Sequence, residues 1–142
     1  MEVSDVRKRV KATLERAKQA AADRRAAADE AASEYQVFLD RVAIPIFRQL
    51  ANILRAEKHP FSINTPGGSV RPISDRSGGD YVELVLETEG SRPHVLVRAN
   101  RGRGRRVIES ETALSPEGRI RDLTEEDVLA AVLKELEPMV ER

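Results

Sequence analysis

The chain has no cysteine, no tryptophan and only two histidines. Without cysteine there can be no disulfides, thiolate metal sites or cysteine nucleophiles, and such a composition fits a reducing compartment. We therefore predict a cytoplasmic location. Every apolar run is far shorter than the roughly 20 residues that cross a membrane, and acids at Glu2 and Asp5 are atypical of a signal peptide. We expect neither a membrane role nor a cleaved leader.

An excess of charge of either sign is also missing. Lys and Arg together number 24, as do Asp and Glu, so the formal net charge is zero. A neutral chain has no global field that would steer it onto nucleic acid or an anionic membrane. Such a role would require a local patch. With 142 residues, 40% of them hydrophobic, the chain has the size and the apolar content of one folded domain.

Glycine is absent from Ser4 to Lys58, and Pro45 is the only proline there. Strong helix formers fill this stretch. Its apolar residues recur with the alternating spacing of four and three that marks a coiled-coil seam, interrupted only at Arg24. The predicted seam residues are Val10, Leu14, Ala17, Ala21, Ala28, Ala31, Tyr35, Phe38 and Val42. Alanine stripes permit close helix packing, so we predict association with another helix. The alternative is a solvated helical arm.

The pattern changes at Pro45, which lacks an amide donor and disfavours helical geometry in the preceding residue. Either the helix kinks there, or a second helix begins with Pro45 in its first turn. We predict a helical arm over residues 1–44 and a small α+β body over residues 45–142. The stretch from Ile46 to Leu54 is apolar on one helical face and is expected to belong to the core of the body.

The rest of the chain predicts an α+β fold in which an antiparallel β-meander of about four strands is followed by a C-terminal amphipathic helix. Alternating apolar residues and turn signals indicate strands. They fall at residues 61–64, 81–88, 94–99 and 106–114, with an edge strand over 69–74 and a short last strand over 119–123. Thr124 and Asp127 have the spacing of a helix capping box. That helix is expected to end near Glu137, before Pro138.

Arginines cluster between Arg92 and Arg106, a segment with no acidic and no aromatic residue. Guanidinium groups at a glycine-bearing hairpin tip suit bidentate contacts with phosphate or carboxylate. The predicted anion-binding residues are Arg98, Arg101, Arg103, Arg105 and Arg106. The alternative is that these arginines pair with acids on neighbouring strands, namely Glu83, Glu87, Glu109 and Glu111.

Other features are weaker candidates. The basic residues between Arg7 and Lys18 are typical of the polar face of a helix, and the glycine loops at 65–69 and 77–80 are explained by turn chemistry. His59 and His94 lack the spacing that would join them in a metal site. We predict no catalytic residue, no cofactor and no metal.

These observations favour a non-catalytic interaction protein that forms a homodimer, or docks on another helical protein, through its N-terminal helix. Nucleic-acid or polyanion binding through the arginine-rich hairpin at 98–106 is the alternative, and an enzyme of unidentified type is a weaker one.

Overall fold

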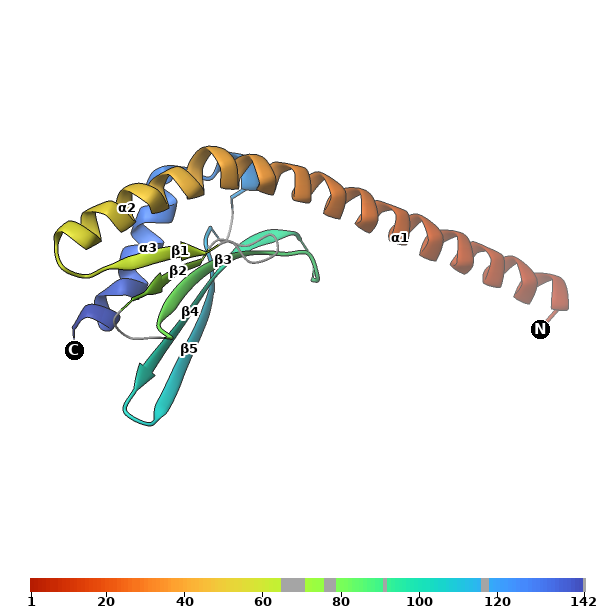
Figure 1. Ribbon diagram of the computed structural model, residues 1–142. Helices are drawn as coiled ribbons and strands as arrows, with labels where there is room; N and C mark the ends of the chain where they lie inside the picture. Colours follow the sequence, from red (N-terminus) through yellow and green to blue (C-terminus); the bar gives the residue numbers. More distant parts are fainter. Residues whose placement is uncertain (65–70, 76–78, 91, 116–117, 142) are drawn as a thin grey trace. The chain divides into compact units, whose positions relative to one another are not determined.

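The computed structural model describes residues 1–64, 71–75, 79–90, 92–115 and 118–141 (Figure 1). Its contacts divide the chain into two compact units, Met1–Glu30 and Ala31–Arg142. The first unit is a single helical segment, and the second is an α+β body. The fold class predicted from the sequence is therefore confirmed, although the sheet has five strands rather than about four.

Helix α1 comprises Val3–Phe38 and so runs through the whole first unit into the second. Alanine and long unbranched side chains dominate it, and neither lowers helix propensity. In the second unit the last turns of α1 bury Ala31, Tyr35 and Phe38 in the core. The predicted arm, residues 1–44, thus includes residues that belong to the packed interior of the body.

The two alternatives at Pro45 are resolved by a π-helical turn at Leu39–Ala43, which joins α1 to helix α2 at Ile44–Ala56. Pro45 stands in the first turn of α2 and removes one amide donor from the continuous helical segment. Its ring would collide with the carbonyl four residues earlier in a regular helix. The wider turn, in which the Ile44 amide donates to the Leu39 carbonyl, accommodates the proline without ending the helix.

The sheet follows chain order, β1-β2-β3-β4-β5, and every neighbouring pair is antiparallel. The strands are Phe61–Asn64, Arg71–Ser74, Tyr81–Glu87, His94–Arg103 and Arg106–Ala113, numbered β1 to β5. Each strand pairs with the next strand along the chain, as the meander prediction required. The longest pairings join β3 to β4 and β4 to β5, so these three strands form the main surface of the sheet.

Strand β2 lies between β1 and β3, so the prediction that this segment forms an edge strand is wrong. The amide of Ser74 donates to the carbonyl of Asp80 on the β3 side, and Pro72, two residues earlier, directs its backbone to that same side. Because Pro72 has no amide hydrogen, it cannot donate to β3. The pairing of β2 with β3 is accordingly short, with Ile73 in register with Tyr81.

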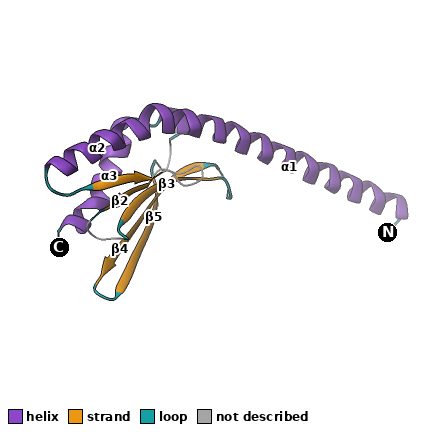
Figure 2. Ribbon diagram, viewed as in Figure 1, coloured by secondary structure: helices purple, strands orange, loops and turns teal. Residues whose placement is uncertain are grey.

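Helices α2 and α3 (Glu125–Val140) lie against the sheet (Figure 2). One face of the sheet supplies buried apolar side chains from β3 and β4, and the two helices supply theirs from their amphipathic faces. The largest fully buried apolar side chains are Phe47, Leu84, Val82, Val97, Val128 and Val132. This core fixes the body from which the β4–β5 hairpin extends.

Two C-terminal expectations are corrected. Residues 119–123 add no strand, because Ile120–Asp122 form a 3₁₀ turn that buries Ile120 and Leu123. Helix α3 does not stop at Glu137 but continues through Pro138 to Val140. A proline this close to the end of a helix removes one hydrogen bond only, and the burial of Met139 in the core holds the last turn in place.

Candidate binding surfaces

In the first unit, the apolar stripe of α1 is exposed. The exposed fractions are 43% for Val6, 50% for Val10 and 56% for Leu14, and Ala17 is exposed as well. Two shallow depressions follow the stripe, one lined by Val6, Val10 and Leu14 and the next by Leu14, Ala17 and Ala21 together with neighbouring polar residues. A single helix cannot bury its own face, so these side chains are available to a partner.

The other predicted seam residues have different surroundings. Ala21 and Ala28 are both half-buried. Ala31, Tyr35 and Phe38 are buried in the second unit, where the Tyr35 and Phe38 rings lie 6.2 Å apart and the Tyr35 hydroxyl donates to the carbonyl of Leu84. Since the body itself covers these three side chains, the surface open to a partner is reduced to Val10, Leu14, Ala17 and Ala21, preceded by Val3 and Val6.

In the second unit, strands β4 and β5 form a hairpin that extends beyond Tyr81, the first residue of β3 (Figure 1). Pairing with β3 ends at Tyr81 and Asn100, whereas β4 and β5 stay paired as far as Arg103 and Arg106. The turn is closed by Gly104, whose φ of +65° is a conformation that a two-residue hairpin turn favours at its first central position. The extension consists of residues 101–108.

Asp80 fixes the base of this extension. Its side chain is 1% exposed, and its Oδ1 accepts a hydrogen bond of 2.8 Å from the amide of Gly102. Nearby, the Asn100 side chain donates to the carbonyl of Gly79. Gly79 and Asp80, just before β3, therefore accept hydrogen bonds from β4 where its pairing with β3 ends.

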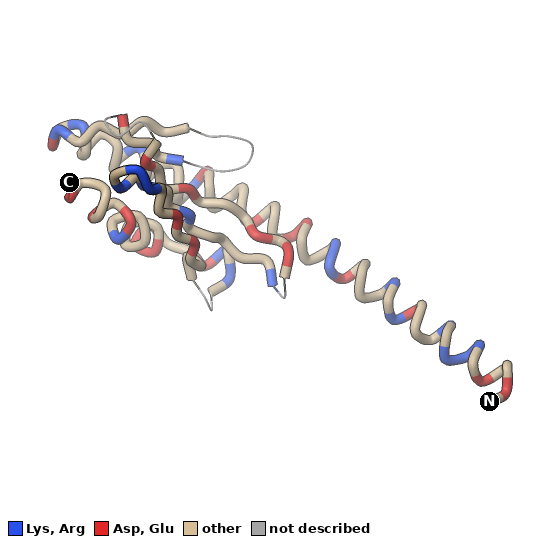
Figure 3. Tube along the Cα trace, turned by 90° about the horizontal axis from the view of Figure 1, so that it is seen from below, with Lys and Arg blue, Asp and Glu red and all other residues tan. Residues whose placement is uncertain are grey.

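Of the predicted anion-binding residues, only Arg98 has an acidic partner among the described residues. Its Nε donates to Glu111 at 2.8 Å, and this hydrogen bond raises the pKa of the Arg98 guanidinium. The remaining four, at the hairpin tip, form no ion pair with any residue that the structure describes: Arg101, Arg103, Arg105 and Arg106. Figure 3 shows basic residues gathered at this turn. Among the described residues, the alternative that these arginines pair with acids on neighbouring strands therefore holds for Arg98 but not for the four at the tip.

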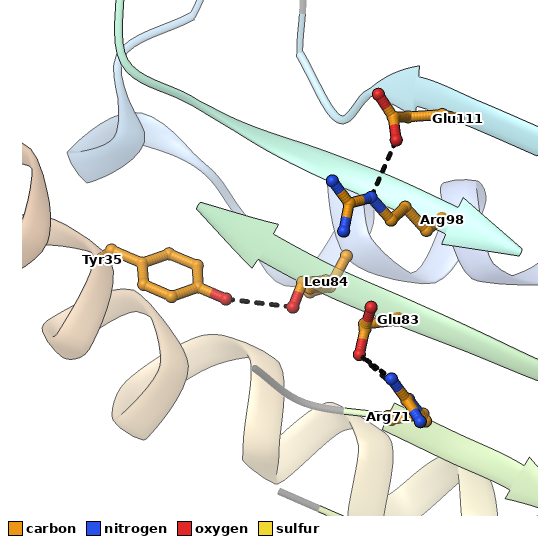
Figure 4. Close-up of polar contacts among 6 residues, drawn as sticks. All are labelled: Tyr35, Arg71, Glu83, Leu84, Arg98 and Glu111. Carbon is orange, nitrogen blue, oxygen red and sulfur yellow. Dashed lines mark hydrogen bonds and ion pairs between the residues drawn. The ribbon is translucent and has the colours of Figure 1, made fainter. Parts of the chain in front are cut away.

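On the face of the sheet opposite the core, charges alternate from strand to strand. Arg71 on β2 contacts Glu83 on β3 at 2.6 Å, Glu83 is in register with Arg98 on β4, and Arg98 is in register with Glu111 on β5 (Figure 4). The Arg71 guanidinium also lies 4.2 Å from the centre of the Tyr81 ring. Opposite charges on neighbouring strands stabilise a sheet. We interpret this row as a structural feature and not as a ligand site.

A small hollow of about 210 Å³ lies where the hairpin passes the end of α3. Arg101, Gly102 and Arg103 line one side, and Pro138 and Glu141 line the other. The hollow is smaller than the usual range of small-molecule sites. It indicates that the arginines on this side of the hairpin face a gap, with one carboxylate at its far wall.

The histidines are not brought together. His94 lies at the start of β4, where its Nδ1 is 2.9 Å from the carbonyl of Arg92, while His59 follows α2. Across the described ranges, no group of three or more His, Cys, Asp or Glu side chains is arranged to hold a metal. The glycine loops considered above fall largely at 65–70 and 76–78, outside the described residues.

Among the described residues, no helix is both long enough and apolar enough to span a bilayer. Comparison with known proteins gives no match: no family model, no curated protein and no solved structure resembles the chain. The structure thus has two candidate binding surfaces, the apolar stripe of the first unit and the arginine tip of the hairpin.

Proposed function

We propose that the protein is a non-catalytic assembly protein whose first unit pairs with the same helix of a second copy. The supporting observation is the stripe of Val10, Leu14, Ala17 and Ala21, of which the first three are exposed and Ala21 is half-buried, on a unit that consists of one helical segment. A stripe at alternating spacings of three and four residues suits the seam of a two-stranded coiled coil. A homodimer is the simplest closed assembly that uses one such surface twice.

The residues that flank the stripe favour a second copy in parallel orientation. On one flank stand Lys11, Lys18 and Arg25, all basic, and on the other stand Thr13, Ala20 and Ala27, all small and uncharged. Two antiparallel copies would place basic flank against basic flank. Two parallel copies place each basic flank against the small flank of the partner, where the aliphatic stems of Lys and Arg can cover apolar surface.

The expected dimer is weak. Full burial of a Val or Leu side chain contributes about 1.5–3 kcal/mol and a methyl group roughly 0.8 kcal/mol, whereas association costs on the order of 4–15 kcal/mol. With only Val10 and Leu14 as large residues in the open part of the seam, the balance is small. Dimerisation should therefore depend on protein concentration.

Sedimentation equilibrium of the full chain tests the proposal, with Ala21→Glu as the seam variant and Ala22→Glu as its matched control. The two substitutions are adjacent, begin from the same residue and add the same charge, but only Ala21 lies on the stripe. We expect the unmodified chain and Ala22→Glu to dimerise at tens to hundreds of micromolar and Ala21→Glu to remain monomeric. A monomeric unmodified chain over this range would rule out the homodimer and leave a different helical protein as the partner.

Orientation has its own test because the chain contains no cysteine. Leu14→Cys and Ala21→Cys, made as separate single-cysteine variants, should each form a disulfide-linked dimer on mild oxidation, since parallel helices place each seam residue beside its own copy. Ala22→Cys, off the seam, is the control and should not cross-link efficiently. Cross-linking at only one of the two seam positions would contradict the parallel arrangement.

A further inference from the structure

The tip of the β4–β5 hairpin carries positive charge that the fold leaves without counter-charges. Residues 101–108 include Arg101, Arg103, Arg105 and Arg106 and no acid. Arg103 and Arg106 lie directly opposite each other in the strand register. Like charges in opposed positions destabilise a strand pair, and none of these four arginines forms an ion pair with a described residue. Such an arrangement is stabilised when an anion lies between the guanidinium groups.

Strand alternation gathers these charges on one side. Arg101, Arg103 and Arg106 share a face of the ribbon, because residues two apart on a strand and residues opposed in register point the same way. The separation along the strand is about 6.8 Å, and that between opposed residues is about 5 Å. Arg105 occupies the turn. The result is an array of guanidinium groups suited to several anionic groups in a row and not to one small ion.

The base of the array is anchored. Asp80 holds the Gly102 amide between Arg101 and Arg103, so the ribbon is fixed where it leaves the sheet. At the same end, Glu141 lines the hollow beside Arg101 and Arg103 and would repel an anion there. Arg103, Arg105 and Arg106 therefore form the outer part of the anion-binding array, and Arg101 forms its inner edge.

We propose that this tip binds the phosphate backbone of duplex nucleic acid. A two-stranded ribbon has dimensions that the major groove of a duplex admits, and arginine forks bind phosphate oxygens bidentately. The segment from Arg92 to Arg106 has no Phe, Tyr or Trp on which an unpaired base could stack, and its one imidazole, His94, lies at the start of β4, far from the tip. This absence favours a duplex over a single strand.

A membrane surface suits the tip less well. Interfacial binding needs an apolar or aromatic anchor beside the basic residues. Among residues 101–108, Val107 is the large apolar side chain exposed to solvent, at 64%. Its place in the register, opposite Gly102, puts it on the other face of the ribbon from Arg101, Arg103 and Arg106. On the arginine face itself, the apolar side chain of residues 101–108 is Ile108, opposite Arg101, and it is half-buried. The array thus has the charge for phosphate, and its own face has no aromatic or fully exposed apolar anchor for lipid.

Fluorescence anisotropy with a labelled 20-base-pair DNA duplex tests the proposal on the full chain. If the four arginines neutralise about four phosphates, the logarithm of the binding constant falls with the logarithm of the salt concentration with a slope of about −3.6, which is about a 150-fold loss between 50 and 200 mM salt. Replacing Arg101, Arg103 and Arg106 together by Gln should reduce the slope to about −0.9. Replacing the same three by Lys should largely preserve it.

The matched control removes the same number of basic residues elsewhere. The triple variant with Gln at Arg7, Lys8 and Arg9 has the same net charge as the hairpin variant, and it should bind the duplex like the unmodified chain. Equal binding by the hairpin variant and the unmodified chain would overturn the proposal, and so would the absence of a salt-dependent affinity. Binding to anionic phosphatidylserine vesicles but not to the duplex would also overturn it.

The proposal is independent of the helix pairing. Circular dichroism and thermal unfolding establish that the hairpin variant is folded, because its three substituted side chains lie outside the buried core. Its sedimentation should equal that of the unmodified chain, whereas Ala21→Glu should keep the salt slope for the duplex. Failure of one proposal is thereby distinguished from failure of the other.

Discussion

The buried carboxylate of Asp80 accepts a hydrogen bond from the amide of Gly102 at 2.8 Å, two residues beyond the last pairing of β3 with β4. The Asp80 side chain thus supplies β4 with a hydrogen-bond acceptor beyond Tyr81, the first residue of β3. A backbone donor left unpaired in such a place costs free energy comparable to a lost hydrogen bond.

We expect Asp80→Ala to lower the free energy of unfolding by about 1–3 kcal/mol, because a hydrogen bond to a buried charged group is lost. The effect should be local, so hydrogen exchange at the Gly102 amide should accelerate. Asp80→Asn retains an acceptor oxygen and is the control, with a smaller loss. An unchanged exchange rate in Asp80→Ala would show that the carboxylate does not hold the hairpin base.

Alkaline pH should destabilise the second unit through Tyr35. Burial, reinforced by the charge of Glu83, raises the pKa of the Tyr35 phenol well above its ordinary value of 10.0. The folded state therefore keeps a proton that the unfolded state releases above about pH 10. Because the unfolded state then binds fewer protons, the stability present at lower pH is lost as the pH rises, by about 1.4 kcal/mol per pH unit.

Urea unfolding between pH 9 and 12 measures this slope. Tyr35→Phe removes the titrating group, so the difference in slope between the two proteins isolates Tyr35 from the titration of lysines common to both. At neutral pH the variant should lose about 1 kcal/mol, since the Leu84 carbonyl loses its donor. Parallel slopes would contradict the assigned direction of the shift.

Replacing Arg71 and replacing Glu83, which form an ion pair, should lower the stability of the protein by different amounts. The Glu83 side chain is 7% exposed and that of Arg71 is 29% exposed. Arg71→Met takes two donated hydrogen bonds from the more deeply buried carboxylate and removes the contact with the Tyr81 ring. Glu83→Met leaves an arginine that can reach water. Removing one partner of a buried pair costs more than replacing both.

We therefore expect Arg71→Met to lose about 1–3 kcal/mol of stability and Glu83→Met to lose less. The double variant should be more stable than Arg71→Met alone. Urea unfolding of the three variants gives the comparison, and equal losses in the two single variants would show that burial does not set the energetics here.

The capping box of α3 offers a direct measure of a helix end. The Thr124 hydroxyl accepts from the Asp127 amide, and the Asp127 carboxylate accepts from the Thr124 amide. Thr124→Ala should lower the free energy of unfolding by about 1 kcal/mol, and Thr124→Ser should be close to neutral. Thermal unfolding of the two variants decides whether the cap contributes to the stability of the body.

Local signals predicted much of this fold. The spacing of Thr124 and Asp127 identified the start of α3, and alternation identified the strands β3, β4 and β5. These features depend on neighbours in sequence, so the chain itself carries the information. The hairpin and its arginines were predicted for the same reason, and Gly104 with its positive φ occupies the turn.

Long-range features were not predictable in this way. Spacing marks Tyr35 and Phe38 as apolar seam residues but does not say whether a second copy or the chain's own sheet covers them. The burial of Asp80 and the isolation of the hairpin arginines depend on where β3 ends relative to β4. The apolar alternation excludes a slip of one residue, but a slip of two residues keeps the same faces and would change both features.

The π-helical turn before Pro45 shifts the angular phase of the helix by one residue. Continuing the α1 spacing past Phe38 would turn positions 42, 45 and 49 inward, but the buried side chains are Ala43, Ile46 and Leu50. Deleting a single exposed residue of the turn, such as Asp40, would restore a regular helix that still turns Ala43, Ile46 and Leu50 inward, but the ring of Pro45 would then meet the carbonyl four residues before it. The five-residue irregularity thus lets the chain carry one additional residue, and a proline, without turning the core side chains away from the sheet.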